Sequence, residues 1–179
     1  MTRMPHRIRN LVLTLHVVIS VGWIGIEAGL LALGLTSLYT RDPEVLWTAY
    51  VAIGLFGRIF IVPVSIGALV TGVLLSIGTP WGLLRHYWVL IKFVLTVALT
   101  AGGILVLNQR LQEAVTRVSG IPVDALNSAY VGTLRFQIVV AVSVALLLLI
   151  TATTLSVYKP WGSMRFGQRK AAQLLSEKG

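Results

Sequence analysis

A histidine and a glutamate lie inside a long apolar stretch near the start of the chain. Residues 11–39 are apolar for longer than the roughly 20 residues that a transmembrane helix needs, yet they include His16 and Glu27. At about 100° per residue, Ser20, Trp23 and Glu27 fall within about 40° of His16, so all four share one helix face. Ionisable side chains at membrane depth are costly, and they therefore indicate a functional site.

A lone histidine inside an apolar bundle, with cations nearby, indicates a haem-binding site. Imidazole is a usual axial ligand of haem iron, the macrocycle is apolar, and its propionates need cationic or hydrogen-bonding partners near an interface. His16 is the candidate ligand, and His86 is a candidate second ligand or propionate partner. The competing interpretation is a histidine that only hydrogen-bonds a backbone carbonyl. The candidate propionate partners are Arg9, Arg85, Tyr87, Trp88 and Lys92.

A second group of charges is expected in the other half of the bundle. Glu27 in the first apolar stretch and Arg58 in the second lie at similar depth, and Arg135 in the fourth lies near them. We predict a Glu27–Arg58 ion pair, because each charge would otherwise be unpaired in lipid. Ser65 and Ser76 fall near the face of Arg58 if their helix is straight. These charges either belong to a binding site or only lock the helices together.

Four apolar stretches account for most of the chain and define its fold class. They cover about 11–39, 47–78, 87–107 and 130–158, in a chain of 179 residues that is 56% hydrophobic and 12% charged. In lipid the backbone must satisfy its own hydrogen bonds, which favours helices over irregular structure. The sequence therefore predicts an all-α integral membrane four-helix bundle, forming a single transmembrane domain over residues 1–179.

The positive charges follow a membrane topology and do not indicate nucleic acid. The formal net charge is +9, and the basic residues gather at the amino terminus, in the second connection and in the tail at 159–179. The positive-inside rule then places both termini in the cytoplasm of a multi-pass plasma-membrane protein. The chain has no cysteine, which excludes disulfides, thiolate-bound metals and iron–sulfur clusters.

An internal repeat relates the ends of the second and fourth stretches. Leu75–Arg85 and Leu155–Arg165 are identical at six of eleven positions, and Thr71 aligns with Thr151 at the same offset. This pattern predicts a duplicated two-helix unit, or alternatively convergence on a common membrane-exit signal.

The first stretch also has a smooth face made of glycines. Gly22, Gly25 and Gly29 fall opposite His16, where they would allow close backbone contact with another helix. We predict a homodimer through this face, although the same face would also serve a helix of the same bundle.

The chain resembles the HemJ-type protoporphyrinogen oxidases, the copper resistance D group and a related family of small four-span membrane proteins. The segment SVYKPWG at 156–162 is most similar to the last of these. The resemblance implies haem b and functional roles for His16 and Lys92. The oxidases have a histidine pair in this helix, whereas residues 103–108 of this chain read GILVLN. The difference argues against oxidase activity more than against a haem site. The resemblance is carried by Leu15–His16, Trp23, Gly29–Leu30, Arg58, Pro63, Thr71–Gly72, Trp88 and Lys92.

Three functions follow from these patterns. The first is a haem b protein for electron transfer, redox chemistry or haem-linked sensing, including a membrane haem oxidoreductase with an unidentified redox partner. The second is a permease for an ion or copper, with Glu27, Arg58 and Lys92 along its path. The third is an assembly subunit whose charges only lock helices. The candidate cofactor-binding residues are His16, His86, Lys92, Trp23, Trp88, Arg9, Arg85, Glu27 and Arg58, and the candidate metal ligands are His16 and His86.

Overall fold

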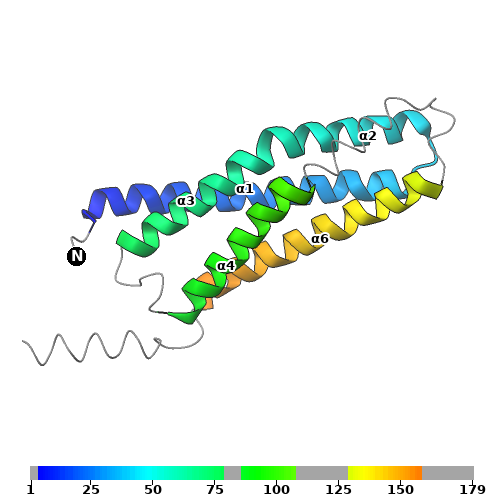
Figure 1. The fold of residues 1–179 in the computed structure, drawn as a ribbon. Coiled ribbons are helices and arrows are strands. Elements are labelled where there is room, and N and C mark those ends of the chain that lie inside the picture. Colours follow the sequence, from blue (N-terminus) through cyan, green and yellow to red (C-terminus); the bar gives the residue numbers. More distant parts are fainter. Residues whose placement is uncertain (1–3, 79–85, 108–128, 159–179) are drawn as a thin grey trace, which may run out of the picture.

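The computed structural model of the chain is a bundle of long helices (Figure 1). It describes residues 4–78, 86–107 and 129–158. Within these residues every regular element is helical, as the sequence predicts, and η1 and η2 are short π-helical segments. The elements are α1 (His6–Tyr39), α2 (Pro43–Phe56), η1 (Gly57–Ile61), α3 (Val62–Gly78), α4 (Tyr87–Gly102), η2 (Gly103–Leu107) and α6 (Ala129–Tyr158).

Four helical stretches in the described part of the chain are long and apolar enough to cross a membrane. They run over His6–Tyr39, Pro43–Gly78, Tyr87–Leu105 and Arg135–Tyr158, which confirms the predicted four-helix membrane bundle. The first two helices begin earlier than their apolar stretches do. The second begins at Pro43 because Asp42 caps it, accepting a hydrogen bond from the Glu44 amide at 2.9 Å.

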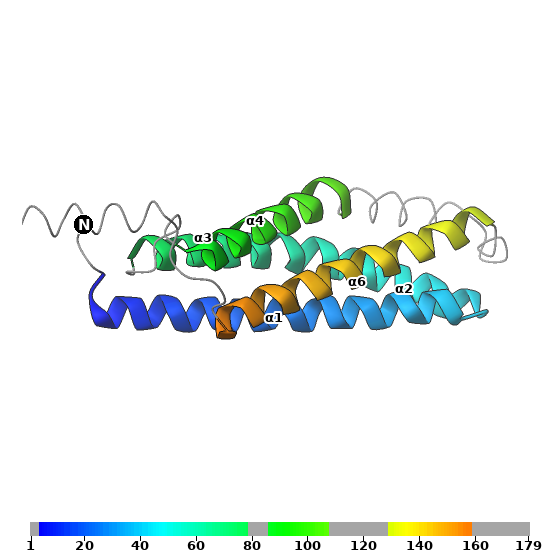
Figure 2. The same ribbon diagram turned by 90° about the horizontal axis from the view of Figure 1, so that it is seen from below.

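Helix α1 lies along the bundle and contacts three of its neighbours. It packs against α2, α3 and α6, whereas α4 packs against α3 and α6 (Figure 2). The start of α1, the ends of α3 and α6 and the start of α4 all lie at one end of the bundle, which we call the amino-terminal end (Figure 1). The chain therefore passes back and forth in an up-and-down order.

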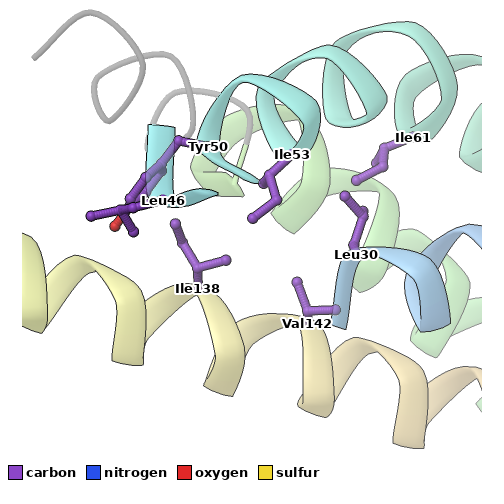
Figure 3. Packing of buried hydrophobic residues seen from close by; sticks show 7 residues of the cluster. All are labelled: Leu30, Leu46, Tyr50, Ile53, Ile61, Ile138 and Val142. Atoms are coloured by element: carbon purple, nitrogen blue, oxygen red, sulfur yellow. The ribbon is translucent and has the colours of Figure 1, made fainter. Parts of the chain in front are cut away.

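An apolar cluster holds α1, α2, η1 and α6 together in the half away from the amino-terminal end. Leu30 of α1 and Ile61 of η1 lie beside Val142 of α6, with the α2 side chains continuing the cluster (Figure 3). All seven members are at most 3% exposed, so this half of the bundle is tightly filled. The cluster comprises Leu30, Leu46, Tyr50, Ile53, Ile61, Ile138 and Val142.

The outer surface of the helices is apolar, as contact with lipid requires. Large side chains such as Val18, Leu55, Val94 and Leu147 are exposed. The glycine face of α1 also points outward, because a Cβ atom added at Gly22, Gly25 or Gly29 would meet nothing within 4 Å. This face is therefore not used for packing among the described helices.

The two copies of the repeat begin in helices that run in the same direction. Helix α3 contains residues 75–78 and helix α6 contains the equivalent residues 155–158, at the 80-residue offset of the repeat. Both segments lie at the amino-terminal end of the bundle (Figure 1). The Pro-Trp-Gly segments that follow lie outside the described residues.

We predict that Gly34→Val destabilises the bundle by about 1–3 kcal/mol, the usual cost of overpacking. A Cβ atom at Gly34 would already lie 3.2 Å from Val139 Cγ2 of α6. Gly25→Val, on the open face of the same helix, is the matched control. Thermal unfolding in detergent, followed by circular dichroism, should show a lower midpoint for Gly34→Val alone. Equal midpoints for the two variants would contradict the α1–α6 packing described above.

Candidate functional site

A cavity of about 630 Å³ opens between α1, α3, α4 and α6 in the half nearer the amino-terminal end. Its size falls within the range of about 300–1,000 Å³ that is typical of small-molecule sites. Its walls are mostly apolar, with a small number of polar side chains among them. Those polar residues are Arg9, His16, Ser20, Thr96, Thr153, Ser156, Ser76 and Lys92, and the two tryptophans are Trp23 and Trp88.

The unbroken α1 helix brings three of the predicted residues into one wall of this cavity. His16, Ser20 and Trp23 all line it, and Glu27 is buried one turn beyond Trp23. The helical periodicity of 3.6 residues therefore predicts this face correctly.

His16 is held by a threonine of the neighbouring helix α3. Its Nδ1 atom lies 2.8 Å from Thr71 Oγ1, and the same hydroxyl donates to the Gly67 carbonyl oxygen at 2.7 Å. When the hydroxyl proton goes to that carbonyl oxygen, Thr71 accepts from His16 and Nδ1 carries the imidazole proton. The Nε2 atom is then the basic nitrogen, which is the form that binds a metal.

A glycine makes room for the imidazole ring. A Cβ atom at Gly72 would lie 3.3 Å from Cε1 of His16, closer than nearly all real contacts of that kind. Gly72 and Thr71 are consecutive, so one turn of α3 both anchors the ring and gives it space.

Lys92 of α4 bonds across the cavity to α6. Its Nζ donates to Ser156 Oγ, and that hydroxyl donates in turn to the Ala152 carbonyl oxygen at 3.0 Å. The ammonium also lies 5.9 Å from the centre of the Trp88 ring, within the range of a cation–π contact. These contacts position the cation inside the bundle instead of at its outer surface.

The residues that line the cavity carry positive charge and no negative charge. Arg9 and Lys92 are cations, and no aspartate or glutamate is among the described lining residues. Arg9 is additionally tied to the start of α1, where its Nη2 donates to His6 Nε2 at 3.1 Å. An apolar cavity with two cations suits a ligand that is mostly apolar and carries acidic groups.

Glu27 bonds to Trp23 and not to Arg58. The Trp23 indole Nε1–H donates to Glu27 Oε1 at 3.1 Å, while Glu27 Oε2 has no hydrogen-bond partner. Glu27 is 2% exposed, whereas Arg58 is an exposed residue of the π-helical segment η1. The predicted Glu27–Arg58 ion pair is therefore not formed, and neither residue lines the cavity.

The sequence of this bundle matches the model of a known protein family. A family model described as predicted integral membrane protein (DUF2269) covers residues 10–160. The chain belongs to this family. No curated protein matches it, and no solved structure does.

In this member of the DUF2269 family, the remaining candidates that the structure describes, His86 and Tyr87, do not line the cavity. His86 directly precedes α4, with its ring 6.3 Å from that of Trp88, but it does not line the cavity. Arg85 lies outside the described residues. Among the described residues, no group of three or more histidine, cysteine, aspartate or glutamate side chains is placed to hold a metal ion.

Two residues that bond His16 and Lys92 were not among the candidate site residues, although the repeat contains a signal for both, and of the two Ser156 lines the cavity. Thr71 anchors His16, and Ser156 bonds Lys92. Ser156 is the repeat equivalent of Ser76, and both serines line the cavity. The aligned Thr71–Thr151 pair is a weaker signal, because Thr151 is exposed and its hydroxyl donates to the Leu147 carbonyl oxygen of its own helix.

We predict that Thr71→Val releases His16 from its fixed tautomer. Nitrogen-15 NMR of histidine-labelled protein should show one Nδ1-protonated form in the unmodified protein and a mixture of tautomers in the variant. Thr151→Val is the matched control, because it removes the equivalent hydroxyl of the repeat without touching His16. An unchanged His16 signal in Thr71→Val would contradict the assigned hydrogen bond.

Proposed function

We propose that this integral membrane protein binds haem b in the cavity between its four helices, with His16 Nε2 as an axial ligand. The observation that supports the proposal best is the fixed imidazole of His16 in an apolar cavity of about 630 Å³. A hydrogen bond to the ring nitrogen that does not bind the metal is the usual way in which a protein orients a metal-binding histidine. Bound haem would supply one-electron redox chemistry, and the proposed role is electron transfer, redox catalysis or haem-linked sensing.

The cations of the cavity fit the acidic groups of haem. Lys92 and Arg9 line the cavity without a carboxylate among the described lining residues to neutralise them. Haem propionates would do so, and a charged hydrogen bond in a water-poor site is stronger than a neutral one. The resemblance to HemJ-type proteins, which implies roles for His16 and Lys92, supports the same two residues.

The placement of the charges favours haem over a permease. An ion or copper permease would need Glu27, Arg58 and Lys92 along one path, but only Lys92 lines the cavity. Arg58 lies on the exposed surface of its helix instead. A second axial ligand is not supplied by His86 in this arrangement, since His86 does not line the cavity.

Two features of the sequence remain predictions about the assembly. The distribution of basic residues predicts cytoplasmic termini in the plasma membrane, and the amino-terminal end with its cavity would then face the cytoplasm. The open glycine face of α1 predicts a homodimer.

We predict that His16→Ala abolishes haem binding. Absorption spectra of the purified protein, oxidised and reduced, should show a Soret band with near-stoichiometric haem b in the unmodified protein and none in the variant. Added imidazole should restore part of the band if the variant keeps its cavity. His86→Ala is the control and should keep its haem. A His16→Ala variant with full haem and an unchanged spectrum would refute the assignment.

We predict that Lys92→Met weakens haem binding about tenfold, which corresponds to about 1.4 kcal/mol. The substitution keeps most of the apolar length of the side chain but removes the cation that would pair with a propionate. Titration of the apoprotein with haemin measures the change. Lys92→Arg keeps the charge and should bind within a few-fold of the unmodified protein. Equal affinity in all three proteins would exclude Lys92 from the site.

A further inference from the structure

A buried carboxyl group at the end of the cavity is not used by the proposed haem site. Glu27 is 2% exposed, and it lies inside a helix long and apolar enough to span a membrane. Only one of its two oxygen atoms has a partner, the indole N–H of Trp23.

The surroundings of Glu27 along α1 are apolar in both directions. One turn further on, Leu30 packs with Ile61 of η1 in the large apolar cluster. One turn back, Trp23 packs with Leu149 of α6 in a second buried cluster. Glu27 therefore lies between two mostly apolar clusters, in which the Trp23 N–H bonds one of its oxygens and no group bonds the other.

The charged and titratable groups of the packed elements are engaged elsewhere or face away. Tyr50 of α2 and Arg135 of α6 interact electrostatically with each other. Lys92 of α4 bonds Ser156, and Arg58 of η1 is exposed. None of these groups bonds Glu27 Oε2.

We propose that Glu27 is a proton-binding site of the membrane bundle. An ionised carboxylate without a counter-charge is far more costly in such surroundings than a neutral carboxylic acid. The proton resides on Oε2, because Oε1 accepts the hydrogen bond from Trp23. This proposal does not require that the cavity binds haem.

The side chain of Trp23 connects Glu27 to the cavity. Trp23 lines the cavity with its ring, and its Nε1–H holds Glu27 at 3.1 Å. A ligand that moves the Trp23 ring changes the hydrogen bond to Glu27 and with it the affinity for the proton. By reciprocity, the protonation state of Glu27 changes the affinity of the cavity for its ligand.

Infrared spectroscopy of the full-length protein in lipid nanodiscs tests the proposal. The chain has only six aspartate and glutamate residues, so the C=O stretching bands of protonated carboxyl groups are few. At neutral pH the unmodified protein should show one such band, which shifts in heavy water. Glu27→Gln should lose it, and Trp23→Phe should shift it without removing it.

Glu44→Gln is the matched control, because Glu44 is an exposed glutamate in the first turn of α2. It should leave the band unchanged. If the unmodified protein has no protonated carboxyl band at neutral pH, the proposal is overturned. A carboxylate band that shifts with added sodium or potassium would overturn it in favour of a metal-cation site.

Haemin added to the same samples separates this proposal from the haem proposal. If haemin binds, the Glu27 band should shift, and a band that stays fixed would overturn the coupling through Trp23. If haemin does not bind and the band is present, the haem proposal fails and the proton site stands.

Discussion

Polar side chains inside this bundle must find their partners within the protein, because hydrocarbon offers none. The described interior meets this requirement mostly through short-range bonds. Serine and threonine hydroxyls donate to backbone carbonyl oxygens one turn earlier, as Ser65 and Ser76 do. The exceptions are informative, since His16 and Lys92 bond side chains of other helices. These two bonds join α1 to α3 and α4 to α6 around one cavity.

The fold and one wall of the site could be predicted from the sequence because α1 is an unbroken α-helix. Its regular rotation of about 100° per residue holds from His6 to Tyr39, so His16, Ser20 and Trp23 reach the same cavity. The same regularity puts Gly22, Gly25 and Gly29 on the opposite, open face. Hydropathy also predicts the four spans, because a helix that faces lipid must be apolar along its whole length.

Prediction failed at Arg58 because the second helical rod is not regular. The π-helical segment Gly57–Ile61 interrupts it, and hydrogen bonds from i to i+5 alter the rotation per residue. Arg58 therefore lies on the exposed face, whereas Ser65 and Ser76, expected on the same face, are buried. Across such an interruption, the depth of a residue along the helix can still be predicted from the sequence, but the direction of its side chain cannot. No residue type in this stretch identifies the π-helical turn in advance.

The two copies of the repeat contribute some identical and some different polar residues to the cavity and its surroundings. Ser76 and Ser156 occupy equivalent positions of the repeat and both line the cavity, so α3 and α6 each supply the same hydroxyl. The residues opposite have diverged, since Thr96 stands where a second His16 would be. Only the Ser156 copy bonds Lys92, and only the Thr71 copy bonds the imidazole. Two helices that carry the same repeated serine thus enclose a cavity in which the His16 imidazole and the Lys92 cation are distinct groups held by different partners.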